Sequence, residues 1–256
     1  QARAMVGVSV APCDVIVAEF LPEISCWERW LEVIATVTTG VVFLTKVVRP
    51  PGVFLIACTT LWTSWFIFQR CRHGSKIFFV WGLRIDQPNL KYSFILPSIF
   101  ALLAIVGIAI AAVVQEHRMQ FDNWHLWLVL VLYPFWGLLQ QVLVFSFLVR
   151  HLNWWYTGSE DKNIINMSWT TGKGCWRSQR CLLFCVALCI FIPTFAFTLL
   201  HSPDGWFMAF AGVMGFFWAI SHLVYRNVLP LGLYHGLLLA LFYFWFVGRD
   251  PLNTLF

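Results

Sequence analysis

Long apolar runs, separated by short polar segments, are the dominant pattern along this chain. Helical runs of this kind can cross about 30 Å of hydrocarbon, because each residue rises about 1.5 Å along the helix. The pattern predicts an all-α, polytopic transmembrane helical bundle of about seven spans, within a range of about six to eight. The expected spans cover approximately residues 31–45, 53–69, 94–114, 125–149, 181–200, 206–223 and 228–247.

Two segments between the expected spans need a separate interpretation. Residues 76–84, KIFFVWGLR, are apolar with basic ends and too short to cross, which favours an interfacial helix or a loop packed at the lipid headgroups. Residues 151–180 are polar, rich in Trp and basic near their end, so we expect a cytoplasmic loop. This loop could dock a partner or pack at the headgroups, and its sequon Asn166-Met167-Ser168 would remain unmodified on the cytoplasmic side.

Composition and charge agree with a membrane protein. Hydrophobic residues make up 60% of the chain, charged residues only 11%, and the mean hydropathy is +0.74. Of the 17 Lys and Arg residues, 13 fall on one side of the expected topology. The positive-inside rule then predicts a cytoplasmic N-terminus and an extracytoplasmic C-terminus. The net charge of +5 is explained by this distribution, and we expect no nucleic acid partner.

The eight cysteines lie mostly in or beside apolar runs, so a disulfide framework is not expected. Cys181, Cys185 and Cys189 recur every four residues and therefore share one helix face. That face could be a thiolate stripe or a small-residue groove for a neighbouring helix. We favour the groove, because no His or carboxylate joins the face to complete a metal site.

Five strongly polar side chains interrupt the later apolar runs. An amide or imidazole buried without hydrogen bonds costs roughly 2–7 kcal/mol, so each is a candidate functional group. Counted from the basic end of its span, Gln141 lies about 14 Å deep and His235 about 10 Å deep, so these two could meet. His201 belongs near the opposite face unless its helix starts outside the membrane or the turn after it dips inward. The five residues are Gln140, Gln141, His201, His222 and His235, of which His222 is expected to be interfacial.

Three motifs occur in order along the second half of the chain. They are the polar pair in WGLLQQVLVFSFLVRHL, the F-x-x-x-H element of Phe197 and His201 in FAFTLLHSPDGW, and His235 in LPLGLYHGLLL. In this order the chain resembles the CPBP family (CAAX protease, bacteriocin-processing and abortive-infection proteins) of intramembrane endopeptidases. The resemblance covers roughly residues 124–246, about half of the chain. It implies a CPBP-like helical core over 124–256, with the cytoplasmic loop at 151–180. The apolar pattern predicts N-terminal membrane helices and a cytoplasmic interfacial segment over 1–123, and we expect the two parts to form one integral membrane unit.

The family motifs imply specific roles. The first motif is Glu-Glu-x-x-x-Arg, whose glutamate activates water together with the histidine of the second motif, while a histidine and an asparagine of the third motif steady the oxyanion. His201 and His235 match the family histidines, and Gln140 and Gln141 occupy the two glutamate positions. These four are the candidate catalytic positions. The chain departs from the arginine and asparagine of the pattern at Phe145 and Leu239.

These departures change the expected chemistry. An amide has no basic site near neutral pH, and general acid–base catalysis typically contributes about 10²–10⁴-fold. Leu239 removes an oxyanion donor, a further loss of about 10²–10³. Two histidines with two amides do not make a catalytic zinc site, which uses three His or carboxylate ligands. Asp204, the carboxylate nearest His201 in sequence, is expected to cap the following helix.

Three hypotheses follow. The leading one is a catalytically impaired member of the family that acts as a binding, scaffold or accessory membrane subunit, with membrane lipids and a membrane protein or peptide as partners. The alternative is an active endopeptidase whose base comes from elsewhere, such as His201 oriented by Asp204. The third is a transport protein or a haem protein with His201 and His235 as axial ligands. The leading hypothesis requires no cofactor and no metal.

Overall fold

The computed structural model describes residues 24–48, 51–86, 90–116, 120–157 and 176–254, and within these ranges the chain forms helices and no strands. The sequon at Asn166 lies outside the described residues. The helices of the N-terminal half are α2 (Cys26–Thr45), α3 (Pro51–His73), the 3₁₀ turn η2 (Gly74–Lys76), α4 (Ile77–Val80) and α5 (Leu90–Val114). The C-terminal half contains α6 (Trp124–Gln141), η3 (Val142–Phe147), α7 (Leu148–Thr157), α9 (Trp176–Leu199), α10 (Gly205–Tyr225), α11 (Leu229–Leu241), η4 (Phe242–Val247) and η5 (Pro251–Thr254).

Five helical segments are long and apolar enough to cross a membrane, so the chain is an all-helical membrane protein. They are Pro51–Val80, Leu90–Val114, Trp124–Trp155, Gly205–Tyr225 and Leu229–Val247. The expected spans 31–45 and 181–200 are also helical, as α2 and α9. However, α2 carries buried charges, and the apolar part of α9 is shorter, Leu183–Leu199. The expected count of seven spans is therefore not confirmed.

One local expectation needs correction. Helix α7 continues to Thr157, so the first part of the expected loop 151–180 is helical. The segment 76–84 includes the short helix α4, and its Ile77 and Trp81 are completely buried. Trp81 packs against Phe66 and Phe147, so this short segment joins α3 to the rod of α6, η3 and α7.

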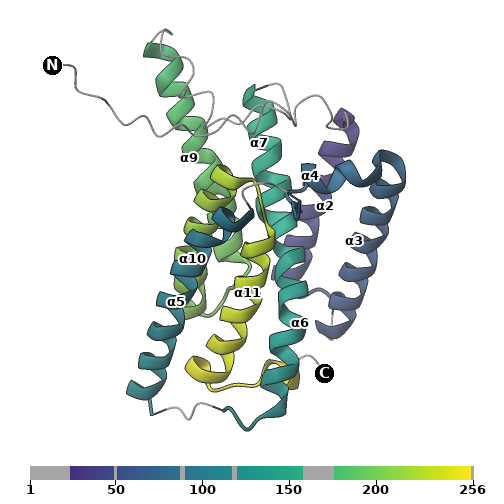
Figure 1. The fold of residues 1–256 in the computed structure, drawn as a ribbon. Helices are drawn as coiled ribbons and strands as arrows, with labels where there is room; N and C mark the ends of the chain where they lie inside the picture. Colours follow the sequence, from purple (N-terminus) through teal and green to yellow (C-terminus); the bar gives the residue numbers. More distant parts are fainter. Residues whose placement is uncertain (1–23, 49–50, 87–89, 117–119, 158–175, 255–256) are drawn as a thin grey trace, which may run out of the picture.

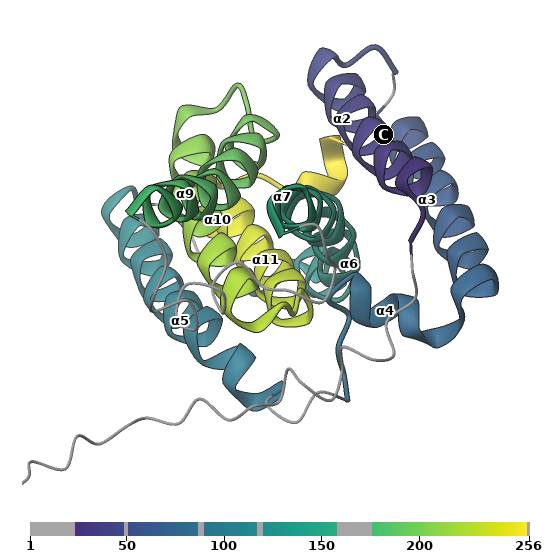
Figure 2. The same cartoon turned by 90° about the horizontal axis from the view of Figure 1, so that it is seen from above.

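The helices run side by side along one common direction (Figure 1). Seen from above, α5, α9 and α10 lie on one side of α11, and the continuous rod of α6, η3 and α7 lies on its other side (Figure 2). Helices α2 and α3 form a pair beyond the rod, which therefore contacts α11 on one side and α2 on the other. The rod therefore links the two parts of the bundle.

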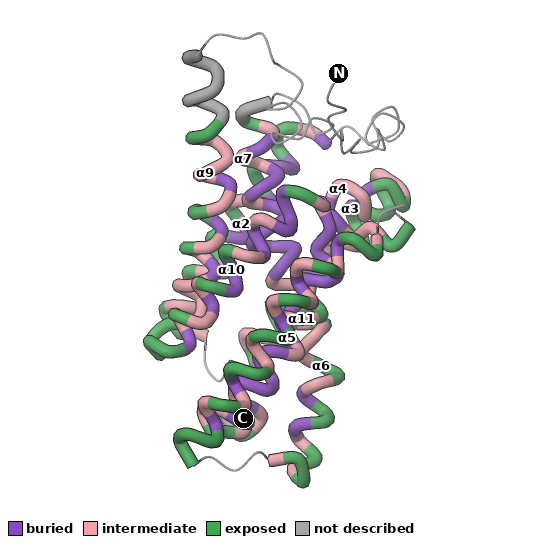
Figure 3. Tube along the Cα trace, turned by 60° about the vertical axis from the view of Figure 1, so that its left-hand side comes forward, coloured by how far each residue is buried: buried purple, intermediate pink, exposed green. Residues whose placement is uncertain are grey.

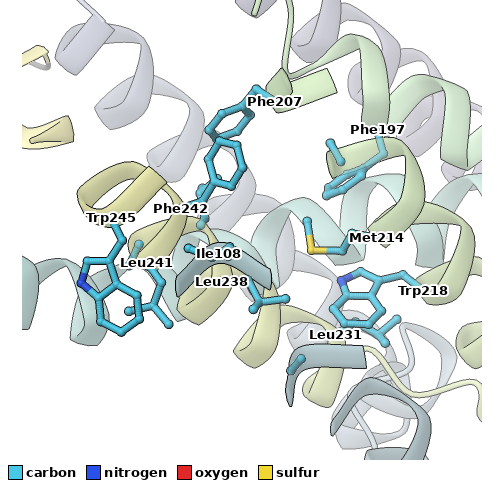
Figure 4. Packing of buried hydrophobic residues seen from close by; sticks show 14 of the residues in the cluster. Ile108, Phe197, Phe207, Met214, Trp218, Leu231, Leu238, Leu241, Phe242 and Trp245 are labelled. Carbon is cyan, nitrogen blue, oxygen red and sulfur yellow. The ribbon is translucent and has the colours of Figure 1, made fainter. Parts of the chain in front are cut away.

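Burial follows this arrangement, with the buried residues gathered along α11 and the rod (Figure 3). Met214 and Trp218 of α10 pack with Leu231 and Leu238 of α11 in the main core (Figure 4). In contrast, α5 exposes large apolar side chains along its outer face, Leu102, Leu103, Ile110 and Val113 among them. An apolar surface of this kind is stable in contact with lipid tails and unfavourable in water.

Glycines allow α6 and α11 to approach to backbone contact. A Cβ built on Gly236 would lie 2.3 Å from the backbone nitrogen of Pro134, and one on Gly232 would lie 2.5 Å from Cα of Leu138. A Cβ on Gly137 would lie 2.6 Å from the carbonyl oxygen of Gly232. Helix packing in membranes relies on such small residues, because no hydrophobic effect draws helices together in lipid. These three glycines form the α6–α11 seam.

We expect Gly236→Ala to destabilise the protein strongly, because the new methyl group would meet backbone atoms, which cannot move aside like a flexible side chain. Overpacking typically costs about 1–3 kcal/mol. The measurement is thermal denaturation of the detergent-purified protein, followed by size-exclusion chromatography. Gly107→Ala on α5 is the matched control, since nothing lies within 4 Å of a Cβ there. Equal melting temperatures for the two variants would contradict backbone contact at the seam.

Two carboxylates of α2 face the bundle. Glu32 pairs with Arg150 of α7, and the indole N–H groups of Trp65 and Trp81 donate to its other oxygen over 3.2 and 3.4 Å. Glu28 accepts hydrogen bonds near the first turn of α2 and pairs with Arg72 at 3.1 Å. These contacts offset the desolvation free energy of the two buried carboxylates, and they attach α2 to α3 and α7.

Candidate functional site

Gln141 and His235 meet across the α6–α11 seam. Both side chains are completely buried, and Nε2 of Gln141 lies 2.6 Å from Nδ1 of His235. With the amide N–H donating, His235 accepts at Nδ1 and carries its own proton at Nε2. Neither Oε1 of Gln141 nor Nε2 of His235 has a hydrogen-bond partner within the described chain. The expectation that His235 contacts one of the two glutamines is therefore confirmed for Gln141.

His201 joins this pair from the turn between α9 and α10. Its ring centroid lies 5.8 Å from that of His235, and the ring stacks on Phe207 of α10 at 5.2 Å. His201 thus lies beside the polar pair, whereas the residues that follow it, 202–206, are exposed and do not dip into the bundle. The Nδ1–H of His201 donates to the carbonyl oxygen of Phe197 over 2.7 Å, which leaves Nε2 as an acceptor.

Burial lowers the pKa of His201 to about 4, although the hydrogen bond to Phe197 opposes the shift. His201 is therefore neutral at physiological pH. A neutral imidazole with an open Nε2 can accept a hydrogen bond from a ligand, but it is a weak base.

Phenylalanines fill the space around the histidines. Phe197 touches the rings of both His201 and His235, with centroids 4.8 and 5.0 Å away. Phe145, at the position where the resemblance would place an arginine, is completely buried against Phe197 at 5.7 Å. Leu239, at the position of the expected asparagine, belongs to the same apolar core. Both positions that depart from the family pattern are thus occupied by packed apolar side chains.

Gln140 does not join the histidines. Successive residues point about 100° apart around a helix, so Gln140 faces a different neighbour from Gln141. It lines a cavity of about 40 Å³ between α2, α3 and α6, together with Thr36, Thr39, Cys58 and other, mostly apolar, residues. Oε1 of Gln140 and Oγ1 of Thr36 are buried there without a hydrogen-bond partner in the described ranges. We call this space the α2–α6 cavity.

Asp204 caps α10 and does not orient His201. Its Oδ1 accepts from the backbone N–H groups of Trp206 and Phe207 over 3.0 and 3.1 Å. The capping role expected from the sequence is confirmed. Because the Nδ1 proton of His201 goes to a carbonyl group, the His201–Asp204 pair, which was one way to supply a base in the alternative hypothesis, is not formed.

Each site helix is followed directly by a π-helical segment. The segment η3 begins at Val142, immediately after Gln141, and all six of its residues are buried. The segment η4 begins at Phe242, about two helical turns after His235 along α11. Such π segments are rare and occur frequently at functional sites. Apolar sequence gives no signal for them, so the sequence alone could not predict them.

The site offers hydrogen bonds and no metal ligand set. Within the described residues, no three His, Cys, Asp or Glu side chains come together in a way that could hold an ion. Cys189 packs instead with Val149 and Leu223, as expected for a small-residue groove. The G-x-x-x-G spacing of Gly232 and Gly236 is a recognised signal for close helix packing, and it marks the position of the seam in the sequence.

The class of protein defined by this fold and site is a helical integral membrane protein with a buried Gln–His–His cluster. No family model, no curated protein and no solved structure matches the chain.

Proposed function

We propose that this protein is a non-catalytic, membrane-embedded binding protein and a divergent relative of the CPBP intramembrane endopeptidases. The observation that carries the proposal is the hydrogen bond between Gln141 and His235. An amide stands where a hydrolase of this type needs a carboxylate, and it keeps the hydrogen-bonding capacity without the basicity. The basic ends of the helices face the cytoplasm in this proposal.

Ligand binding is supported by buried polar atoms that have no hydrogen-bond partner among the described residues. Oε1 of Gln140 and Oγ1 of Thr36 are acceptors beside the mostly apolar lining of the α2–α6 cavity. A buried polar atom without a hydrogen-bond partner costs about 1–3 kcal/mol of stability. A ligand with a donor group would recover this free energy by forming the hydrogen bond. The cavity admits only a small group such as a peptide N–H, so the lipid chain of a lipidated peptide would lie outside it, against the apolar surface of the bundle.

The experiment uses the purified full chain in detergent and a fluorogenic farnesylated peptide. We expect the peptide to bind without measurable cleavage, because the Gln–His–His cluster contains no carboxylate and the buried imidazole of His201 is only a weak base. Gln140→Leu should weaken binding about tenfold, since it removes the acceptor and keeps the side chain's size. Native mass spectrometry measures the bound peptide, and fluorescence measures cleavage.

Gln69→Leu is the matched control, because Gln69 is another completely buried glutamine but does not line the α2–α6 cavity. Cleavage by the wild-type protein that disappears in His201→Ala would overturn the non-catalytic assignment. Equal peptide binding by wild type and Gln140→Leu would overturn the assignment of the cavity.

A further inference from the structure

A second cavity lies at the end of the bundle that carries most of the basic residues. Its volume is about 20 Å³, and α7 and α10 form its walls together with the turn after α4. Its polar lining consists of Arg150 and Asn153 from α7, and His222 and Arg226 from α10. No described carboxylate lines it. We call it the α7–α10 cavity.

The cationic groups are held in place by the fold. The side chain of Arg150 is only 5% exposed, and Glu32 pairs with it from the side of α2, outside the cavity. Arg226 caps α10 in a left-handed conformation, with φ of 49°. Arg84 and Arg226 are both close enough to His222 to act on it electrostatically. Arginines from both α7 and α10 thus line the cavity.

A buried nitrogen without a hydrogen-bond partner, Nδ1 of His222, belongs to the wall of the α7–α10 cavity. His222 is 94% buried, as its exposed fraction is 6%, and its Nδ1 has no hydrogen-bond partner within the described chain. His222, expected from the sequence to be interfacial, lies in the last turn of α10 and in the wall of this cavity. A buried imidazole nitrogen beside arginines is suited to donate to, or share a proton with, an anionic oxygen.

Backbone geometry keeps the cavity open. Gly82 has a φ of 73°, and a Cβ there would lie 3.0 Å from the carbonyl oxygen of Arg226 and 3.3 Å from Cε1 of His222. The carbonyl oxygen of Gly82 accepts from the N–H of Val228 over 2.9 Å, which fixes the turn against the end of α10. A side chain at residue 82 would therefore press against His222 and Arg226, which form the α10 wall of the cavity.

We propose that the α7–α10 cavity binds a phosphate group, with one phosphate oxygen inside it between Arg226 and His222. A volume of about 20 Å³ admits about one water-sized group, which matches a single oxygen, while the remainder of the phosphate lies at the mouth. Arginine recognises phosphate through directed, charge-assisted hydrogen bonds. Basic pockets between membrane helices at the headgroup level bind anionic lipid headgroups, and soluble phosphate offers the same chemistry.

The test is native mass spectrometry of the full chain, purified in detergent, with added phosphatidylglycerol or inorganic phosphate. Arg226→Asn removes the charge and keeps a residue that tolerates positive φ, and Gly82→Ala fills the cavity without changing any charge. We expect each variant to lower phosphate-group binding about tenfold. Lys91→Gln, which removes an exposed cation at the same end of the bundle, should change binding less than about twofold.

Two arms of the experiment identify the source of the phosphate. Variant-sensitive binding of phosphatidylglycerol alone assigns the site to a lipid headgroup, and variant-sensitive stabilisation by inorganic phosphate without lipid assigns it to a soluble ligand. Equal binding by wild type, Arg226→Asn, Gly82→Ala and Lys91→Gln overturns the proposal. Size-exclusion chromatography verifies folding of each variant, and one folded variant of the two is sufficient for the test.

Discussion

Gln141→Glu is expected to raise hydrolysis of a farnesylated peptide by about 10²-fold or more over the wild-type background. The substitution places a carboxylate at the position where the amide nitrogen now lies 2.6 Å from Nδ1 of His235. A carboxylate next to an imidazole can accept a proton from water, which the amide cannot do. The measurement is the rate of fluorescence release by the purified protein in detergent.

Gln140→Glu is the matched control for this prediction. It introduces the same charge one residue away, but toward the α2–α6 cavity and not toward the histidines. Its rate should remain at background. A second change, Leu239→Asn, is expected to raise the rate of Gln141→Glu further, because it supplies an oxyanion donor worth about 10²–10³-fold. Equal rates for the two Gln→Glu variants would contradict the proposed relationship to hydrolases.

Arg150→Met is expected to lower stability more than any other single change considered above. It leaves Glu32 buried without its cationic partner, and breaking a buried ion pair costs roughly 3–5 kcal/mol. Thermal denaturation in detergent, followed by size-exclusion chromatography, measures the effect.

The double variant Glu32→Leu with Arg150→Met should recover most of the lost stability. Replacing both members of a buried pair by apolar groups is often neutral or stabilising. Arg72→Met is the control for a partner at the surface, since its side chain is 47% exposed, and it should cost less than about 1 kcal/mol. If the double variant is no more stable than Arg150→Met alone, the ion pair is not the source of the effect.

Much of the fold was predictable because apolar runs of membrane length can hardly form anything but helices. The five segments that could cross a membrane all fall on expected spans. The sequence did not predict that α7 continues through Trp154 and Trp155, because HLNWWYT has the polar composition of a loop. Nor did it predict the pairing of Glu32 with Arg150, which lie 118 residues apart in the chain.

The candidate site was predictable in part. The depth of each side chain from the basic end of its span was sufficient to predict that a glutamine meets His235. This depth depends only on the helical rise per residue. Depth could not show which of Gln140 and Gln141 makes the contact, because the two side chains lie at nearly the same depth and point in different directions around α6. That direction depends on where α11 lies, and α11 is positioned by contacts far away in sequence.

The α6–α11 seam has a consequence for how such a site can change its chemistry. Gly137, Gly232 and Gly236 set the distance between the two helices by backbone contact, so the separation of residues 141 and 235 does not depend on which side chains occupy them. A carboxylate can be exchanged for an amide at this place without moving either helix. The framework and the reactive groups are then independent of each other, and a chain can lose or regain a reaction by single substitutions on an unchanged support.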